Sequence, residues 1–563
     1  MFAINKDVYD DRARSVMRLR GLIAHDSSLE ATLEHLIDRI CEIDGALGGV
    51  DSMRFREALS NLIGDGVIIL GTPILQNIGP GSGSAAGCTV LRPWNDSNMR
   101  RGSELLARAS MMLSDATGIG FDLSALSHPS DALVSLNEHL GRVNEVLVGR
   151  SKRPVASMAT IRDDHADLVS FIRSKRNVDF SHWRLTISVF VSDALILAAE
   201  QDQMWALRDK SGYVVSEMRA RKVLREIAES AHYCGEPGVL FRDRLEADNA
   251  TPAWNYVSTA PCAELAMAEG EACHFSYLNL GKLVTDGQLD LDRFEAAASC
   301  CTRMLDAATE FTIQGRGDLL KLVSEKRRIG VGITGFADFL IKMRVDYRTP
   351  RARELAAEIA ENLDYFTKRA SVDLAQQRGP FQAIASSRYV DVQWVRRKLH
   401  GKKLQVQQSK WDSLVSDILT HGIRNSSTTS MPPSGTSSEI VGVSKSLEPY
   451  LTLRDTQGVL HKIFRDLQEN PKWGEDALAQ DARLLALPYV SLAKDIEPLS
   501  HVAIQAAFQS FVDDGISKTI NMANACTADE VYDLLFLAFR HGLKGLSVFR
   551  DGCLSEREAS NAI

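Results

Sequence analysis

Apolar residues recur along this chain at two spacings, one typical of helices and one of strands. Between residues 7 and 61 they lie three or four positions apart, as in Ala31–Ile40, which predicts helices. Three short apolar or β-branched runs predict buried strands: Val67–Leu70, Ala86–Leu91 and Leu185–Val191. Gly102–Ser114 and Asp193–Glu200 predict helices, and Thr117–Gly120 predicts a glycine turn. The alternation predicts an α/β fold behind an N-terminal helical layer.

Composition narrows the class of protein. The chain has 563 residues, enough for several domains or for one large α/β barrel. Its 65 basic and 73 acidic side chains give a net charge of −8, which argues against a nucleic-acid partner. The N-terminus has no basic stretch followed by an apolar run, and no apolar run approaches the 18 or so residues that span a bilayer. We therefore expect a cytoplasmic protein without membrane contact.

The cysteines point to reduced thiols. There are nine, an odd number that is sparse for a secreted disulfide scaffold. No Cys-x-x-Cys occurs and no histidine lies at zinc-finger spacing, so we expect no metal site.

Two polar or glycine-rich stretches are candidates for binding. Arg327–Asp338 contains three glycines without the Lys-Ser/Thr of a phosphate loop, which favours close packing of a strand against a helix. Asn425–Ile440 gathers hydroxyls and a glycine ahead of an apolar run, a pattern that suits a phosphate at a helix N-terminus. A Ser/Thr-rich solvent loop is the alternative reading of that second stretch.

The stretch with the most chemistry is Ala260–Glu264. Cys262 precedes Glu264 by two residues, and Cys273 follows eleven residues after the first cysteine. Pro261 favours an extended backbone, which would place the Cys262 sulfur and the Glu264 carboxylate on the same face of the chain. The alternative is a buried structural cysteine beside a surface glutamate.

Six segments, in order, carry a resemblance to a known family. They are Thr72–Gly79 with Cys88; Ser157–Ile172; Pro261–Glu264 with Cys273 and Asn279–Leu280; Arg327–Asp338; Met431–Ser438 with Leu447–Pro449; and Ile516–Asn521 with Leu543–Arg550. From about Leu62 to Asp551 the chain resembles the catalytic subunit of ribonucleotide reductase, and especially its cobalamin-dependent class II enzymes.

The resemblance implies an architecture and a set of site residues. The fold would be a ten-stranded α/β barrel of two five-stranded half-barrels, spanning 67–551, with a central finger loop that carries Cys262. Residues 1–66 would be a helical region without an ATP-binding cone, and 552–563 a short tail. Cys262 would carry a thiyl radical, Glu264 would accept the 3′-hydroxyl proton, and Cys88 and Cys273 would supply two electrons as they form a disulfide. The positions that would contact substrate are Thr72, Ser434, Gly435, Thr436, Ser437 and Ala260.

The class and the partners are also implied by the resemblance. Val548 and Phe549 stand where subunit-dependent enzymes carry adjacent tyrosines, so we expect adenosylcobalamin as cofactor. The expected partners are a ribonucleotide, a nucleotide effector, a thioredoxin-like thiol reductant and a second copy in a homodimer.

Several positions depart from the family pattern. Ala260 replaces an asparagine that orients substrate hydroxyls, Ala263 replaces a glycine, and Gly87 replaces a small hydroxyl residue. Arg153–Val155 stiffens the specificity loop, and Cys553 alone stands for a pair of tail cysteines. Three hypotheses stay open: a class II reductase, a related radical enzyme that modifies a nucleotide or nucleoside in a specialised pathway, and a non-catalytic nucleotide-binding paralogue.

Overall fold

The computed structural model describes residues 3–23, 27–92, 99–148, 155–176, 183, 185–400, 405–467 and 477–553. Arg153 and Pro154 of the expected specificity loop, and residues 554–563 of the expected tail, lie outside the described residues.

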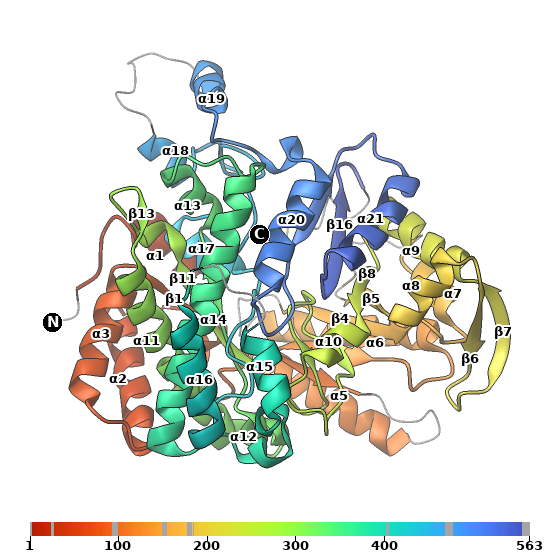
Figure 1. Ribbon diagram of the computed structural model, residues 1–563, viewed down its shortest axis with the longest axis horizontal. Helices are drawn as coiled ribbons and strands as arrows, with labels where there is room; N and C mark the ends of the chain where they lie inside the picture. The colour runs from red at the N-terminus through yellow and green to blue at the C-terminus, as the bar shows by residue number, and fades with distance from the viewer. Residues whose placement is uncertain are drawn as a thin grey trace.

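The N-terminal helical layer has the predicted form. It consists of α1 (Asp11–Leu19), α2 (Leu29–Ala46) and α3 (Ser52–Gly64). The side chains of Asp10 and Ser28 cap the first two helices by accepting a backbone N–H three residues on. These helices stand at one edge of the molecule, where α2 packs against α11 (Leu291–Arg316) (Figure 1). Both helices bury apolar side chains in the same hydrophobic core.

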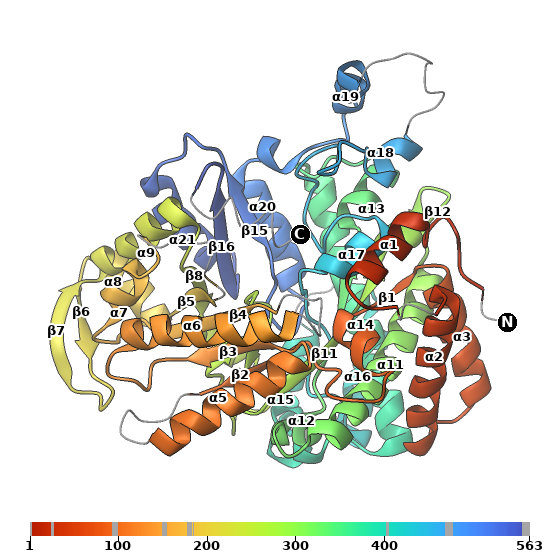
Figure 2. The same cartoon turned by 180° about the vertical axis from the view of Figure 1, so that it is seen from behind.

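Five parallel strands form the first half of the large sheet. They are β2 (Cys88–Leu91), β3 (Gly118–Asp122), β4 (Ser157–Arg162), β5 (Leu185–Val191) and β8 (Gly238–Phe241). The helices that connect and cover them are α5 (Met99–Ser114), α6 (Pro129–Val148), α7 (Leu168–Arg173), α8 (Asp193–Glu200) and α9 (Ala220–Cys234). In Figure 2, α5 and α6 lie across one face of these strands. The predicted turn at Thr117–Gly120 is wrong, because Gly118–Gly120 begin β3.

The second half of the sheet runs antiparallel to the first. β11 (Ala272–Asn279) pairs antiparallel with β2 and parallel with β14 (Ile329–Thr334), while β16 (Gly545–Arg550) pairs antiparallel with β8 and parallel with β15 (Thr519–Met522). Single parallel bridges, Val331 to Thr429 and Met431 to Ile516, link β14 towards β15. With β1 (Ile68–Leu70) on β11, the sheet has ten strands, and no continuous ladder closes it. The predicted α/β fold is confirmed, and the ten strands among the described residues agree with the predicted ten-stranded barrel although their ladder stays open.

The remaining elements surround this sheet. The long helices α14 (Pro350–Arg378) and α11 pack side by side behind the second half, beside α20 (Pro498–Gln509) (Figure 1). The others are β6 (Met204–Arg208), β7 (Val214–Arg219), α10 (Arg242–Ala247), β12 (Val284–Thr285), β13 (Gln288–Leu289), α12 (Lys321–Lys326), α13 (Phe336–Lys342), α15 (Val392–His400), α16 (Gln408–His421), α18 (Lys462–Asp466), α19 (Ala477–Leu485) and α21 (Ala528–Arg540), with short 3₁₀ turns at Leu280–Lys282, Gln382–Ser386, Arg388–Val390 and Ala493–Asp495. Within the described part of the chain, every helix is too short or too polar to cross a membrane.

A hairpin enters the space between the two halves of the sheet. Its limbs are β9 (Ser258–Thr259) and β10 (Ala266–Met267), and we call residues 258–267 the finger. A Cβ atom built on Gly120 would lie 1.9 Å from the Thr259 carbonyl oxygen, so β3 admits the finger only because it has glycine there. The finger loop that the resemblance implies is therefore present between the half-sheets.

Candidate active site

The tip of the finger is a tight turn. The backbone N–H of Ala260 donates to the Leu265 carbonyl oxygen at 2.7 Å, and that of Ala263 donates to the Ala260 oxygen at 2.9 Å. Ala263 has φ of 64°, in the left-handed region. The predicted extended backbone is therefore wrong: the chain must reverse inside the sheet, and this reversal overrides the local preference that Pro261 imposes. Left-handed backbone costs an alanine roughly 1 kcal/mol relative to glycine.

Cys88 and Cys273 face each other across the seam of the two half-sheets. They are direct partners in the antiparallel pairing of β2 with β11. Directly opposed residues in such a pair have Cα atoms about 4.5–5.5 Å apart, which is within the range that a disulfide bridges. Burial raises the pKa of the Cys273 thiol well above its usual value, so this sulfur stays protonated near neutral pH.

The finger tip and the Cys88 thiol border the same small space. A Cβ atom built on Gly118 would lie 2.9 Å from the Pro261 ring and 3.3 Å from the Cys88 sulfur. Cys262 follows Pro261 at the tip and keeps partial exposure, whereas Cys88 and Cys273 are buried. The structure thus gathers the three cysteines selected from the sequence around one site.

Glu264 is a buried carboxyl group with an unused oxygen. It is 1% exposed, and its Oε2 atom has no hydrogen-bond partner among the described residues. Burial, with a smaller contribution from the nearby negative charge of Asp514, raises the pKa of Glu264 to about 7. A carboxyl group in this state exchanges a proton readily near neutral pH.

The hydroxyl-rich stretch begins a helix, as predicted. Ser434, at φ 52°, precedes α17 (Gly435–Val441), and its hydroxyl oxygen accepts the Ser446 N–H at 2.9 Å. The Ser437 hydroxyl donates to the Leu70 carbonyl oxygen at 2.9 Å, two residues before Thr72 begins α4 (Thr72–Asn77). The N-termini of α4 and α17 are therefore neighbours. Gly435 and Thr436 remain half-buried between them.

Ala260 is fully buried at the base of the tip, and its backbone N–H is used by the turn. Its methyl group offers no hydrogen bond to a substrate. The asparagine of the family pattern, which Ala260 replaces, would therefore stand in the finger, two residues before Cys262.

The glycines of Arg327–Asp338 were predicted to pack against a helix. The structure instead places the segment around Ser430 against two of them. A Cβ on Gly330 would lie 2.1 Å from the Ser430 hydroxyl oxygen and 3.5 Å from the Cys273 sulfur, and one on Gly332 would lie 2.9 Å from the Ser430 carbonyl oxygen. These glycines let residues 430–432 run close beside β14, next to Cys273.

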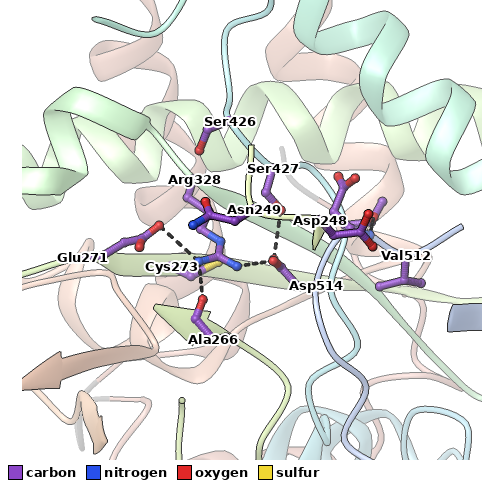
Figure 3. Close-up of polar contacts among 12 residues, drawn as sticks. Asp248, Asn249, Ala266, Glu271, Cys273, Arg328, Ser426, Ser427, Val512 and Asp514 are labelled. Atoms are coloured by element: carbon purple, nitrogen blue, oxygen red, sulfur yellow. Dashed lines mark hydrogen bonds and ion pairs between the residues drawn. The ribbon is translucent and has the colours of Figure 1, made fainter. Parts of the chain in front are cut away.

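Sequence reasoning missed a buried cluster of charges behind the finger. Arg328 contacts Glu271, Asp514 and the Ala266 carbonyl oxygen (Figure 3). The available signal was the placement of one charged pair, Arg327–Arg328, directly ahead of apolar strand residues, and of a second, Asp513–Asp514, directly after the apolar Phe511–Val512. Charges in such positions are buried only when paired.

Comparison with known proteins agrees with this geometry. The family described as ribonucleotide reductase, barrel domain, matches residues 86–549. This match spans most of the chain, from the start of β2 to the end of β16. The chain belongs to the ribonucleotide reductase barrel-domain family.

Among curated relatives, several are named vitamin B12-dependent ribonucleoside-diphosphate reductase. The one from Thermoplasma acidophilum is 28% identical over 569 residues, covering 95% of this chain and 69% of the relative. The one from Mycobacterium tuberculosis (strain CDC 1551 / Oshkosh) is 27% identical over 547 residues, covering 91% and 74%. The large subunit of ribonucleoside-diphosphate reductase from Variola virus is 23% identical over 469 residues, covering 74% and 60%.

Proposed function

We propose that this chain is an adenosylcobalamin-dependent ribonucleotide reductase that converts ribonucleoside diphosphates to 2′-deoxyribonucleoside diphosphates. The observation that carries the proposal is the direct pairing of Cys88 with Cys273 beside a finger whose tip presents Cys262 and Glu264. Relatives named as B12-dependent diphosphate reductases support the cofactor and the substrate class.

Each residue has a task that its surroundings suit. A thiyl radical on Cys262 removes the 3′ hydrogen of the ribose, and Glu264 takes the proton of the 3′-hydroxyl through its unpartnered Oε2 atom. The Cys88 thiol protonates the 2′-hydroxyl, which leaves as water. The Cys273 thiol gives its hydrogen to C2′, and Cys88 and Cys273 form one disulfide, whose two electrons balance the loss of the 2′ oxygen. Glu264 returns its proton to the 3′ oxygen, and Cys262 regains its radical when its hydrogen returns to C3′.

The same arrangement sets the direction in which a nucleotide lies. Gly330 stands beside the Cys273 sulfur, and four residues further along β14 the Thr334 hydroxyl lies 3.1 Å from that of Ser434. Four strand residues span about 13 Å. A ribose with its 5′ phosphates covers this separation once the contact distance to the protein at each end is added. The N–H groups that begin α4 and α17 would then face the phosphates, with Gly435 and Thr436 nearest to them.

The site fits an external source for the radical. Cys262 retains exposure at the finger tip, and Val548 and Phe549 on β16 have no phenolic proton to relay. Adenosylcobalamin, when bound, supplies a radical by homolysis of its cobalt–carbon bond. The chain contributes the sulfur that receives the radical and the surrounding strands that shelter it from water.

The buried methyl of Ala260 favours a second candidate. Without an orienting amide, the same thiyl chemistry could serve a reductase-like enzyme that modifies a nucleotide or nucleoside in a specialised pathway. A non-catalytic nucleotide-binding paralogue is disfavoured by the retained cysteine arrangement.

The test is incubation of the purified chain with adenosylcobalamin, a dithiol and each ribonucleoside di- or triphosphate, followed by product identification. We expect deoxyribonucleoside diphosphates. A different nucleotide product would support the second candidate, and no product with any substrate would support the paralogue. Activity that appears only on addition of a metal-containing subunit would overturn the cofactor assignment.

The remaining partners and the location are proposals from the family resemblance alone. The partners are a thioredoxin-like reductant for the Cys88–Cys273 disulfide, a nucleotide effector and a second copy of the chain. The location is the cytoplasm. Disulfide reduction by thioredoxin in place of a synthetic dithiol tests the first of these directly.

A further inference from the structure

We propose that Arg328 is a positioning residue for the finger. Its guanidinium ties the returning limb of the hairpin to the segment beneath the tip, and this connection sets where Cys262 and Glu264 stand. The inference deepens the proposed reductase function and rests on it.

The first connection is to the returning limb. Arg328 lies directly before β14 and is 2% exposed. Its Nη1 atom donates to the Ala266 carbonyl oxygen at 2.6 Å and to Glu271 Oε1 at 3.1 Å (Figure 3). Ala266 is the first residue of β10, two positions after Glu264. The guanidinium therefore holds the finger close to its proton-accepting residue.

Glu271 holds the same limb at a second point. Its Oε2 atom accepts the Ala268 N–H at 2.9 Å and the Lys326 ammonium at 2.7 Å. Glu271 thus holds Ala268, and Arg328, which pairs with the other Glu271 oxygen, holds Ala266. Together the two side chains fix the chain on both sides of Met267. The limb thus has two anchors, and Arg328 takes part in both of them.

The second connection reaches beneath the tip. Arg328 Nη2 pairs with Asp514 Oδ1, and Asp514 Oδ2 accepts the Ser427 hydroxyl at 2.9 Å (Figure 3). The next residue, Gly515, touches the tip: a Cβ there would lie 2.8 Å from the Ala263 oxygen and 3.1 Å from the Glu264 oxygen. One planar side chain therefore links the limb of the finger to the backbone on which its tip rests.

The charges of the cluster explain why arginine serves here. Arg328 and Lys326 balance the charges of Glu271 and Asp514, and each of these carboxylates has an ion-pair partner. The guanidinium presents donors in a rigid fork, which serves a carbonyl and two carboxylates at fixed angles, whereas an ammonium imposes no such plane. Removing the guanidinium leaves the buried Asp514 carboxylate without its ion-pair partner, whereas Glu271 keeps Lys326.

The experiment compares Arg328→Lys and Arg328→Gln with a matched control, Arg378→Gln. Arg378 is also a buried arginine, with its side chain 1% exposed, and it pairs with Asp44 and Asp306. Hydrogen–deuterium exchange is followed at the finger, where the N–H groups of Val257 and Ala260 donate to Met267 and Leu265. Arg328→Gln should speed exchange of peptides covering 257–268, whereas Arg378→Gln should leave them near wild type. Arg328→Lys should give an intermediate effect.

Turnover gives an independent readout. Arg328→Gln should lower kcat by about a hundredfold, the typical effect of a 1 Å misplacement of reacting groups, with KM little changed because the phosphates bind at α4 and α17. Arg328→Ala removes the buried guanidinium and leaves its space open. Free guanidinium at millimolar concentration should therefore restore part of both finger protection and kcat to this variant.

The outcomes separate the two proposals. If the finger exchanges equally in the Arg328 and Arg378 variants, or if Arg328→Gln keeps wild-type kcat, the positioning role is wrong. If the wild-type chain makes no deoxyribonucleotide, the proposed function fails, but the exchange comparison still decides whether Arg328 holds the finger.

Discussion

Glu264 offers the sharpest test of the proposed chemistry, because its pKa decides when it can accept a proton. Burial, with the nearby charge of Asp514, raises that pKa from 4.5 to about 7. At 1.36 kcal/mol per pKa unit, this shift corresponds to about 3 kcal/mol of penalty on the ionised form. Backbone hydrogen bonds from Glu264 and Cys262 offset this penalty only in part, and Oε2 has no hydrogen-bond partner among the described residues.

The first assay is the pH dependence of kcat/KM, which reports groups of the free enzyme. Turnover needs the ionised Glu264, so kcat/KM should fall below about pH 7. It should be about tenfold lower at pH 6 than on the plateau. A carboxyl group of ordinary pKa would leave the rate nearly unchanged at that pH. A flat profile down to pH 5.5 would refute the assignment of Glu264 as the proton acceptor.

The second assay follows stability in Glu264→Gln, which should be inactive. A raised carboxyl pKa means that the folded protein binds more protons than the unfolded chain between about pH 4.5 and 7. Wild-type stability is therefore lost as pH rises through this window, and the glutamine variant escapes that loss. Relative to wild type, the variant should gain about 2–3 kcal/mol between pH 5 and pH 8 in urea unfolding. If the difference in unfolding free energy between the variant and wild type is the same at pH 5 and pH 8, the Glu264 carboxyl titrates with an ordinary pKa.

Four further substitutions or measurements test the remaining residues. Cys262→Ser should abolish turnover without changing the unfolding midpoint, because a serine O–H bond is too strong to carry the radical; retained turnover would exclude the thiyl mechanism. One turnover without external reductant should leave Cys88 bonded to Cys273 in peptide maps, and two free thiols after product formation would contradict 2′ reduction. Ala263→Gly should raise the free energy of unfolding by roughly 1 kcal/mol, since glycine adopts φ near 64° without strain; an unchanged midpoint would show that the turn is unstrained. Ala260→Asn should raise the rate of deoxynucleotide formation, with some loss of stability from overpacking at a buried site. A folded variant that forms less product would mean that another donor already orients the substrate.

The sequence predicted much of the fold because its signals were local. The periodicity of residues 7–61 follows from helices with one buried face, and α1, α2 and α3 appear where that spacing placed them. The β-branched run Leu185–Val191 matches β5 without an error at either end. The order of six motifs then indicated how these elements join in one sheet, which periodicity alone cannot specify.

The predictions that failed depended on distant parts of the chain. Gly118 and Gly120 were taken for a turn, whereas they leave room on β3 for Pro261 and Thr259, more than 130 positions away. The tip at Ala263 turns because both limbs of the finger are held inside the sheet, a constraint absent from the local sequence. Arg328 was passed over because the acceptors that explain its burial, Glu271 and Asp514, come from separate segments.

These distant constraints also explain how the site keeps its two polar groupings apart. The N-terminus of α17 lies at Thr334, the last residue of β14, whereas Arg328 lies directly before Ile329, the first residue of that strand. Beyond the larger effect of burial, Asp514 of the Arg328 cluster raises the pKa of Glu264. Because Arg328 and Lys326 offset the summed charge of Asp514 and Glu271, the cluster competes little for the substrate phosphates. Replacing such a paired cluster with apolar side chains often leaves stability unchanged or improved, so its value here lies in geometry. The rigid link from Ala266 to Asp514 holds the strained turn at Ala263 and the buried carboxyl of Glu264 between the two polar groupings, where the ribose is expected to lie.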